Sequence, residues 1–187
     1  MILDHDLLLG ISVQLAGRLT IVSESMETLN LHIEAKLLSA GASILGFADI
    51  STLPTSARGE MKSAVSIAVA LDASVVKEIS EGPTQRYQRD YTRVNQRLAH
   101  LCTSTVDDLK RRGYKGRAID PTIRIEGAAM KTFATALPHK TVATRAGLGW
   151  IGKSALLITP SHGPALRLAT VLTDAPLKCG NPIDDSR

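Results

Sequence analysis

Hydrophobic residues recur at helical spacing in two segments of this chain. One predicted helix covers residues 29–40, and Gly41 follows it where a helix commonly ends. A longer helix is predicted after the break at Gly82–Pro83, and Gly113 ends it. Its apolar stripe consists of Tyr87, Tyr91, Val94, Leu98, Leu101, Thr105 and Leu109.

Short apolar runs between the helices predict strands. These runs cover residues 42–48, 63–71, 115–119, 155–158 and 168–172. The run at 63–71 is apolar nearly throughout, as expected for a strand covered on both faces. We interpret residues 51–59 as a loop and 75–80 as a helical turn. Because strands alternate with helices, the predicted class is α/β (α+β), a mixed sheet flanked by helices.

The predicted domain organisation has three parts. Residues 1–25 form an uncertain N-terminal extension, which we interpret as helical; Asp4 and Asp6 argue against a signal peptide, and Arg18 against a spanning helix. Residues 26–177 form a single α/β domain. Residues 178–187, which contain Pro, Gly and Asp, are interpreted as a linker.

Composition narrows the class of protein. The 187 residues are 44% hydrophobic and 21% charged, which is ordinary for a soluble globular protein. The net charge of +4 permits an anionic ligand but does not by itself argue for nucleic acid. Two cysteines, Cys102 and Cys179, favour neither a disulfide scaffold nor a zinc motif, and a reduced, cytoplasmic compartment is the simpler interpretation.

The long helix carries a basic stripe. Arginines at positions 86, 89, 93 and 97 follow one another at helical spacing. The stripe is either a solvated face or a contact with an anion or an acidic partner. Cys102, beside the apolar stripe, is expected to be a packed thiol.

The segment Gly147–Ser154 satisfies two nucleotide-binding patterns at once, the dinucleotide fingerprint and the phosphate loop. Both require a helix to follow the glycines, whereas residues 155–160 are predicted to form a strand. A phosphate-loop enzyme remains the alternative hypothesis. A further interpretation is a tight turn whose glycines permit close packing.

The same segment offers groups for a larger ligand. We expect Arg145, Trp150 and Lys153 to converge on one concave site, with Gly147 and Gly149 as its floor. Such a site suits a large ligand with amide and phosphate groups. Weaker candidates are His139, a proton donor or a helix cap, and Asp120, a catalytic acid or a turn residue before Pro121.

Residues 139–177 (HKTVATRAGLGWIGKSALLITPSHGPALRLATVLTDAPL) resemble the signature of the epoxyqueuosine reductase-like iron–sulfur proteins. The resemblance implies a fold like the cobalamin-processing and nitroreductase-like domains. It also implies an oxidoreductase that binds cobalamin without a lower ligand from the protein, and a tRNA substrate. The residues that would line the corrinoid pocket are Lys140, Arg145, Ala146, Gly147, Gly149, Trp150 and Lys153.

Two departures from the family pattern limit this implication. The family holds four-iron four-sulfur clusters in a following segment, whereas Cys179 alone cannot ligate a cluster. The electron donor would then be an iron–sulfur protein or segment outside this chain, and a non-catalytic scaffold that docks such a donor is a further alternative. In addition, the family's aspartate proton donor, which precedes the lysine matching Lys140, falls at Phe133 here.

Overall fold

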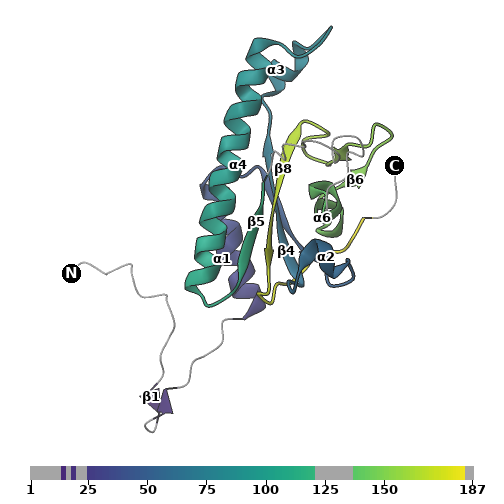
Figure 1. The fold of residues 1–187 in the computed structure, drawn as a ribbon. Coiled ribbons are helices and arrows are strands. Elements are labelled where there is room, and N and C mark those ends of the chain that lie inside the picture. Colours follow the sequence, from purple (N-terminus) through teal and green to yellow (C-terminus); the bar gives the residue numbers. More distant parts are fainter. Residues whose placement is uncertain (1–13, 16–17, 20–24, 121–136, 184–187) are drawn as a thin grey trace, which may run out of the picture.

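A four-stranded sheet forms the centre of the fold. The computed structural model describes residues 14–15, 18–19, 25–120 and 137–183. The strands follow the spatial order β3-β4-β8-β5, and neighbouring strands are antiparallel throughout (Figure 1). Their bounds are β3 Ile44–Asp49, β4 Ser63–Ala70, β5 Gly116–Ile119 and β8 Leu166–Thr173.

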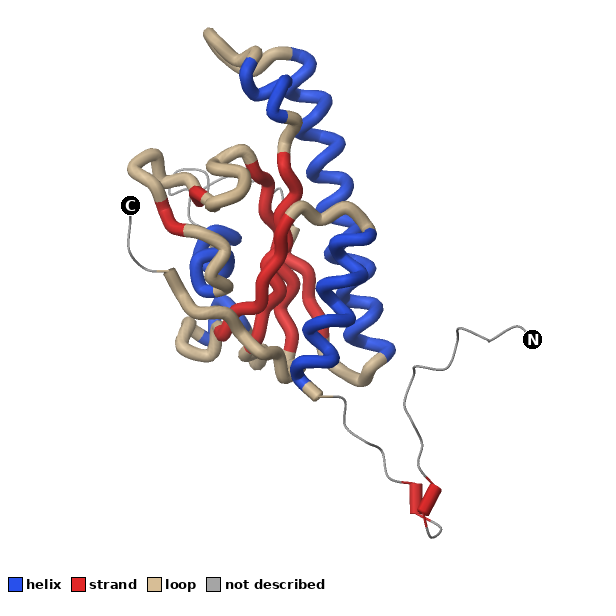
Figure 2. Tube along the Cα trace, turned by 180° about the vertical axis from the view of Figure 1, so that it is seen from behind, coloured by secondary structure: helices blue, strands red, loops and turns tan. Residues whose placement is uncertain are grey.

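Helices cover both faces of this sheet. α1 (Met26–Ser39) and the long α4 (Gln85–Arg111) pack on one face. α6 (His139–Arg145) packs on the other face, together with α2 (Thr55–Arg58), and Figure 2 shows the sheet between the two helical layers. α3 (Ala73–Lys77) packs against α4 at the end of that helix that extends past the sheet (Figure 1).

The alternation of side chains along the central strands explains the two layers. Val65 and Ile67 of β4 point into the core beneath α1 and α4. Ala64 points into the second core, where it meets Val142 of α6 and Leu172 of β8. The prediction that the run at 63–71 is covered on both faces is therefore confirmed.

Side-chain caps set the starts of the two long helices. The Ser25 hydroxyl accepts the Thr28 N–H at the start of α1, and the Thr84 hydroxyl accepts the Tyr87 N–H at the start of α4, both at 3.1 Å. Each cap satisfies a backbone donor that has no partner inside the helix. Both helices lie where the sequence periodicity predicted them.

The α/β class with flanking helices is confirmed, and four details differ from expectation. The described strand pairs of the central sheet are antiparallel, whereas a mixed sheet was predicted. Residues 51–59 contain α2, and the predicted strand 155–158 shortens to β7 (Leu157–Ile158), which pairs with β6 (Trp150–Ile151). Residues 178–183, predicted to belong to a linker, form backbone hydrogen bonds to β3 and α6.

The predicted helical extension is wrong where the structure describes it. β1 (Gln14–Leu15) and β2 (Arg18–Leu19) pair as short antiparallel strands. Isoleucine, valine and threonine residues occur on both sides of these strands in the sequence, and such residues favour strands over helices. Among the described residues, no helix is both long enough and apolar enough to cross a membrane.

Candidate functional site

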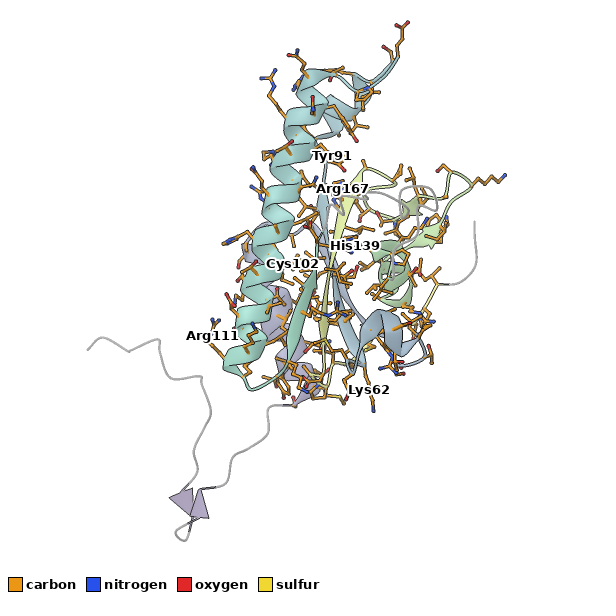
Figure 3. All side chains as sticks on the ribbon, in the orientation of Figure 1. Lys62, Tyr91, Cys102, Arg111, His139 and Arg167 are labelled. Atoms are coloured by element: carbon orange, nitrogen blue, oxygen red, sulfur yellow. The ribbon has the colours of Figure 1, made fainter. Side chains whose placement is uncertain are left out.

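A pocket of about 320 Å³ lies where the start of α6, the turn between β6 and β7, and the start of β8 meet. Its polar lining residues are His139, Lys140 and Arg167, and Figure 3 shows His139 and Arg167 near this end of the sheet. Its apolar lining comes from Leu137, Pro138, Ala155, Leu156, Leu157, Pro164, Leu166 and Leu168. Leu156 is 52% exposed, which makes it an accessible apolar side chain at this site.

The His139 ring bridges two strands. Its Nε2 atom lies 3.0 Å from the Asp120 carbonyl oxygen and its Nδ1 atom lies 2.9 Å from the Thr170 hydroxyl. A carbonyl only accepts, so Nε2 carries the proton and, in the neutral ring, Nδ1 accepts from Thr170. Burial lowers the pKa of His139 below its ordinary value, which favours this neutral form. Both ring nitrogens are thus engaged by the protein, which suits a positioning role better than proton donation.

Lys140 lies at the pocket next to a strained backbone position. Its Nζ atom donates to the Ala155 carbonyl oxygen at 3.1 Å. Ala155 has a φ of 59°, in the left-handed region that a residue with a Cβ rarely occupies. The lysine therefore helps to hold an unfavourable turn beside the pocket, while its ammonium keeps further donors for a ligand.

Arg167 connects the pocket to the long helix. Its guanidinium carbon lies 4.3 Å from the centre of the Tyr91 ring, and its Nε atom donates to Asn95 Oδ1 at 3.1 Å. A stacked and hydrogen-bonded arginine loses little further side-chain freedom when it binds a ligand. Sequence reasoning missed this residue, although it is the charged residue in an otherwise uncharged strand, β8.

The glycines of Gly147–Gly152 pack against the chain itself. A Cβ on Gly149 would lie 2.0 Å from the Ile158 carbonyl oxygen, and one on Gly152 would lie 2.8 Å from the Ile158 side chain. Gly147 has a φ of 74°, and a Cβ there would lie 2.8 Å from the Asn181 carbonyl oxygen. These positions bring backbone segments into close contact. That Gly147 and Gly149 also form the floor of a ligand site stays a prediction.

A second close approach secures the end of α6. A Cβ on Gly180 would lie 2.5 Å from the Ala146 carbonyl oxygen, and one on Gly46 would lie 3.1 Å from the same atom. Gly180 donates its N–H to Phe47 at 2.8 Å. Residues 178–183, β3 and the end of α6 thus meet with no room for side chains, and this contact fixes the helix that carries His139 and Lys140.

The remaining predicted binding residues lie outside the described pocket lining. Arg145 is close enough to Asp49, at the end of β3, to contribute to lowering that carboxyl's pKa, behind the larger effect of hydrogen bonds from Ser51. Trp150 pairs with Ile158 between β6 and β7, and Lys153 is exposed in the following turn. That Arg145, Trp150 and Lys153 converge on one concave site stays a prediction. Ala146 is buried at the end of α6.

Of the two catalytic candidates, Asp120 contacts His139 through its backbone carbonyl oxygen. Phe133 lies outside the described residues.

Burial raises the pKa of the Cys102 thiol to about 12, in agreement with the predicted packed cysteine. Within the part of the chain that the structure describes, no cluster of His, Cys, Asp or Glu side chains could hold a metal ion.

The nucleotide-binding interpretations lack their structural context. Gly152 is followed by a turn and then by β7, rather than by the helix whose N-terminus would face a phosphate. Gly147–Gly152, predicted as a tight loop between a short helix and the strand at 155–158, follows the short helix α6 and itself contains the short strand β6.

Comparisons with known proteins agree on the fold. No family model matches the chain. A 46-residue segment is 52% identical to the epoxyqueuosine reductase of Synechococcus sp. (strain RCC307), over 25% of this chain and 14% of that protein. A solved epoxyqueuosine reductase with a tRNA stem loop matches 87% of this chain and 49% of its own, with 18% identity and a TM-score of 0.58.

A solved reductive dehalogenase, described as informing a mechanism for B12-dependent dehalogenation, matches 94% of this chain and 22% of its own, with 18% identity and a TM-score of 0.61. The fold is therefore that of an α/β domain found in epoxyqueuosine reductases and in B12-dependent dehalogenases. More narrowly, the resemblance to the epoxyqueuosine reductases is confirmed by a shared sequence segment as well as by fold. The chain spans about half the length of the solved epoxyqueuosine reductase.

Proposed function

We propose that this chain is the corrinoid-binding part of a redox protein resembling epoxyqueuosine reductase, and that the pocket between α6 and β8 receives one edge of the corrinoid. The observation that carries the proposal is the composition of the pocket. An apolar lining surrounds two cations, Lys140 and Arg167, each already anchored to the protein.

The chemistry of these residues fits a corrinoid. Its flat apolar ring matches the leucine and proline side chains, and its peripheral amides and phosphate match cationic donors. His139 is the imidazole of the described lining, and both of its nitrogens bond to the protein. The described pocket therefore presents no ring nitrogen for cobalt, which agrees with binding without a lower ligand from the protein.

A corrinoid is larger than a pocket of about 320 Å³, so most of it would extend over neighbouring surface. We place Trp150 and Lys153 at that periphery, together with Arg145. Ala146, Gly147 and Gly149 would act behind them by fixing the end of α6 against β3 and β7.

When bound, the corrinoid would supply the redox chemistry, and the chain would bind and orient it. Lys140 would offer N–H donors to an amide or phosphate oxygen while it holds the Ala155 turn. His139 would keep the start of α6 in place through its bonds to Asp120 and Thr170, and Leu156 would exclude water from the ring edge. Asp120 and His139 thus enter the proposal as positioning groups.

The partners follow from the same analogy. The chain contains two cysteines, too few for a four-iron four-sulfur cluster, so the proposed electron donor is an iron–sulfur segment or protein outside this chain. The proposed substrate is a tRNA, because one structural neighbour is an epoxyqueuosine reductase in complex with a tRNA stem loop. The unpaired cysteines support a cytoplasmic location.

The test is a titration of the purified chain with cobalamin, followed by ultraviolet–visible absorption. We expect a saturable spectral change, and Lys140→Ala should weaken binding about tenfold, since a charge-assisted hydrogen bond contributes roughly 1.5–3 kcal/mol. Lys62→Ala is the matched control, because Lys62 is exposed at the opposite end of the sheet (Figure 3).

Two results would contradict the proposal. One is the absence of any spectral change at millimolar cobalamin. The other is tight binding of a nucleoside triphosphate with magnesium that competes with cobalamin, which would revive the phosphate-loop hypothesis.

A further inference from the structure

The basic stripe predicted from sequence lies along one edge of the exposed face of α4. Arg86, Arg89, Arg93 and Arg97 are all exposed. The buried side of the helix, with Val94, Leu98 and Leu101, packs against the sheet. The arginines lie along the boundary between this buried side and the solvent-facing side, since Arg97 stands one helical turn before the buried Leu101.

No exposed carboxylate interrupts this face between Gln85 and Thr103. Asp90 is the acidic residue of that stretch, and it is 8% exposed. The other exposed side chains there are polar or small, namely Gln85, Gln88, Thr92, Gln96, Ala99, His100 and Thr103. The first exposed acid further along the helix is Asp107.

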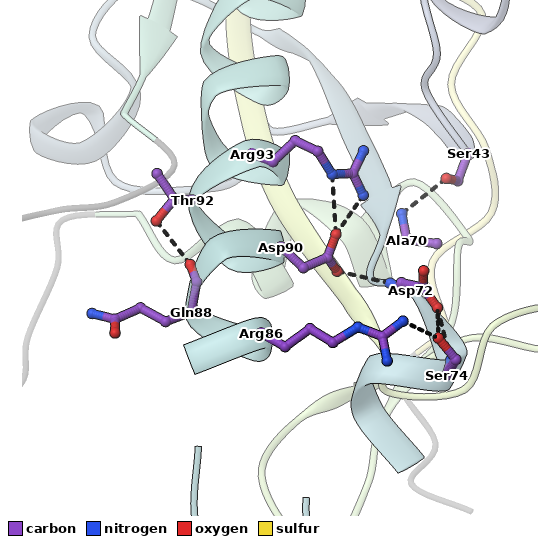
Figure 4. Close-up of polar contacts among 9 residues, drawn as sticks. All are labelled: Ser43, Ala70, Asp72, Ser74, Arg86, Gln88, Asp90, Thr92 and Arg93. Atoms are coloured by element: carbon purple, nitrogen blue, oxygen red, sulfur yellow. Dashed lines mark hydrogen bonds and ion pairs between the residues drawn. The ribbon is translucent and has the colours of Figure 1, made fainter. Parts of the chain in front are cut away.

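Two of the arginines are held in place from the protein side. Asp90 accepts the Asp72 N–H at 2.8 Å through one oxygen and the Arg93 Nε–H at 3.1 Å through the other (Figure 4). Arg86 donates to Ser74 at 3.1 Å and pairs with Glu78. Arg93 thus has a fixed orientation and retains further N–H groups for a ligand.

The other two arginines carry uncompensated charge. Arg89 and Arg97 form no ion pair with any residue that the structure describes. The Arg97 side chain lies along Gly41, where an added Cβ would come within 3.3 Å of its guanidinium. Because a helix rises about 1.5 Å per residue, Arg89, Arg93 and Arg97 follow one another at intervals of about 6 Å.

We propose that this stripe, defined by Arg89, Arg93 and Arg97, is a docking surface for the phosphodiester backbone of a nucleic acid. Consecutive guanidinium groups along one line match consecutive phosphates along one strand, and each can bind a phosphate in a bidentate manner. The glutamine and threonine side chains between them add hydrogen-bond donors of the kind that contact phosphate and sugar oxygens.

The composition of the stripe favours a nucleic acid over an acidic protein. Protein interfaces are enriched in arginine as well, but the arginine accompanies an apolar or aromatic centre. The exposed large hydrophobic residues of the described chain are Met26, Leu31, Leu38, Ile79 and Leu156, and α4 contributes none of them. A charged polar face without an apolar anchor is typical of contacts with a phosphate backbone.

This inference rests on the tRNA substrate of the proposed function and deepens it, because it names a surface outside the pocket that would contact the nucleic-acid backbone. The two lie at the same end of the sheet, since Tyr91 of α4 stacks on Arg167 of the pocket (Figure 3). Cobalamin binding and nucleic-acid binding are measured separately, so failure of one leaves the other intact.

The test uses fluorescence anisotropy with a labelled single-stranded RNA of about 20 nucleotides, at several salt concentrations. Arg89→Gln/Arg97→Gln removes two charges that make no described ion pair, so it should leave the fold intact. The matched control, Lys62→Gln/Lys115→Gln, removes the same charge from exposed lysines near the other end of the sheet. Circular dichroism checks that both variants remain folded.

We expect the arginine variant to bind at least about tenfold more weakly than the wild type, and the control to change less than threefold. The slope of log affinity against log salt should fall by about 1.4 in the arginine variant, since each phosphate contact on a single strand contributes about 0.7. Equal losses in both variants would overturn the proposal, as would no RNA binding at low salt. Equal or tighter binding of poly-glutamate would also overturn it, by indicating an acidic protein partner.

Discussion

The Nδ1 atom of His139 lies 2.9 Å from the hydroxyl of Thr170, and this contact attaches α6 to the central strand β8. On the neighbouring strand, β4, the residue paired with Thr170 is Ser66. The Ser66 hydroxyl is buried and has no hydrogen-bond partner within the described residues. Two hydroxyls in register beneath the same helix therefore have opposite energetic roles.

This difference predicts opposite effects of removing each hydroxyl. Ser66→Ala should raise the free energy of unfolding by about 1 kcal/mol, because a buried unpaired hydroxyl is costly. Thr170→Val should lower it by about 1–2 kcal/mol, because the buried Nδ1 acceptor of His139 loses its donor. Urea denaturation of both variants measures the two values, and a loss in Ser66→Ala equal to that in Thr170→Val would contradict the assignment.

The lowered pKa of His139 predicts an acid-sensitive stability. The folded protein binds the proton less readily than the unfolded chain, so stability is full above the ordinary value of 6.5. It should decline as the pH falls from about 6.5 towards the depressed folded pKa, because the unfolded chain takes up the proton first. His139→Gln should flatten this decline in denaturation curves measured between pH 7.5 and 5, and an unchanged slope would show that another group is responsible.

From the lowered pKa of Asp108 we expect a second loss of folding stability at lower pH. Burial alone would raise its pKa, but the nearby charges of Lys36, His32 and Arg112 outweigh burial and hold the pKa below its ordinary value. A carboxyl group whose pKa is lowered on folding stabilises the protein fully above about pH 3.8. This stabilisation is lost as the pH falls through the pKa of the folded state. Asp108→Asn should cost about 3 kcal/mol at neutral pH, since the partner charges lose their counterion. Thermal unfolding at pH 7 and below pH 4 tests this. An Asp108→Asn variant as stable as the wild type at pH 7 would refute it.

Because Gly147 lies close to Asn181, we expect a side chain at Gly147 to destabilise the protein more than its positive φ alone would. Gly147 and Gly163 both have positive φ, 74° and 54°, but a Cβ meets Asn181 only at Gly147 and finds open space at Gly163. Gly163→Ala should therefore cost about 1–2 kcal/mol, the left-handed penalty. Gly147→Ala should cost more, because residues 178–183 must also shift. Equal costs in chemical denaturation would show that the contact with Asn181 is loose.

The sequence was sufficient for the elements whose signal is local. The period of apolar residues located α4, and the continuous apolar run located β4, since a buried helix face and a doubly covered strand each leave a regular pattern. The caps at Ser25 and Thr84 are local as well. The same local logic indicated that Gly147–Gly152 leads into a strand.

Local sequence patterns could not predict the packing role of Gly147 and Gly149. Gly149 is constrained by Ile158 and Gly147 by Asn181, contacts that depend on how distant segments pack. The pattern of small and cationic residues predicted a ligand floor, and it contained no signal for the close backbone packing of the same glycines. Arg167 was missed for a related reason, because its importance comes from Tyr91 and Asn95 on another element.

The meeting of Gly46, Gly147 and Gly180 has a consequence for how such a chain changes over evolutionary time. At Gly147 and Gly180 a side chain would require a second backbone segment to move, and at Gly46 it would press on Leu148 and on the end of α6. Substitutions there cannot accumulate one at a time without loss of the contact that fixes α6. Among natural relatives that keep the pocket helix in this place, we expect the three glycines to be inherited as a unit, and lineages that lose one to have rebuilt the strand, the turn and the following segment together.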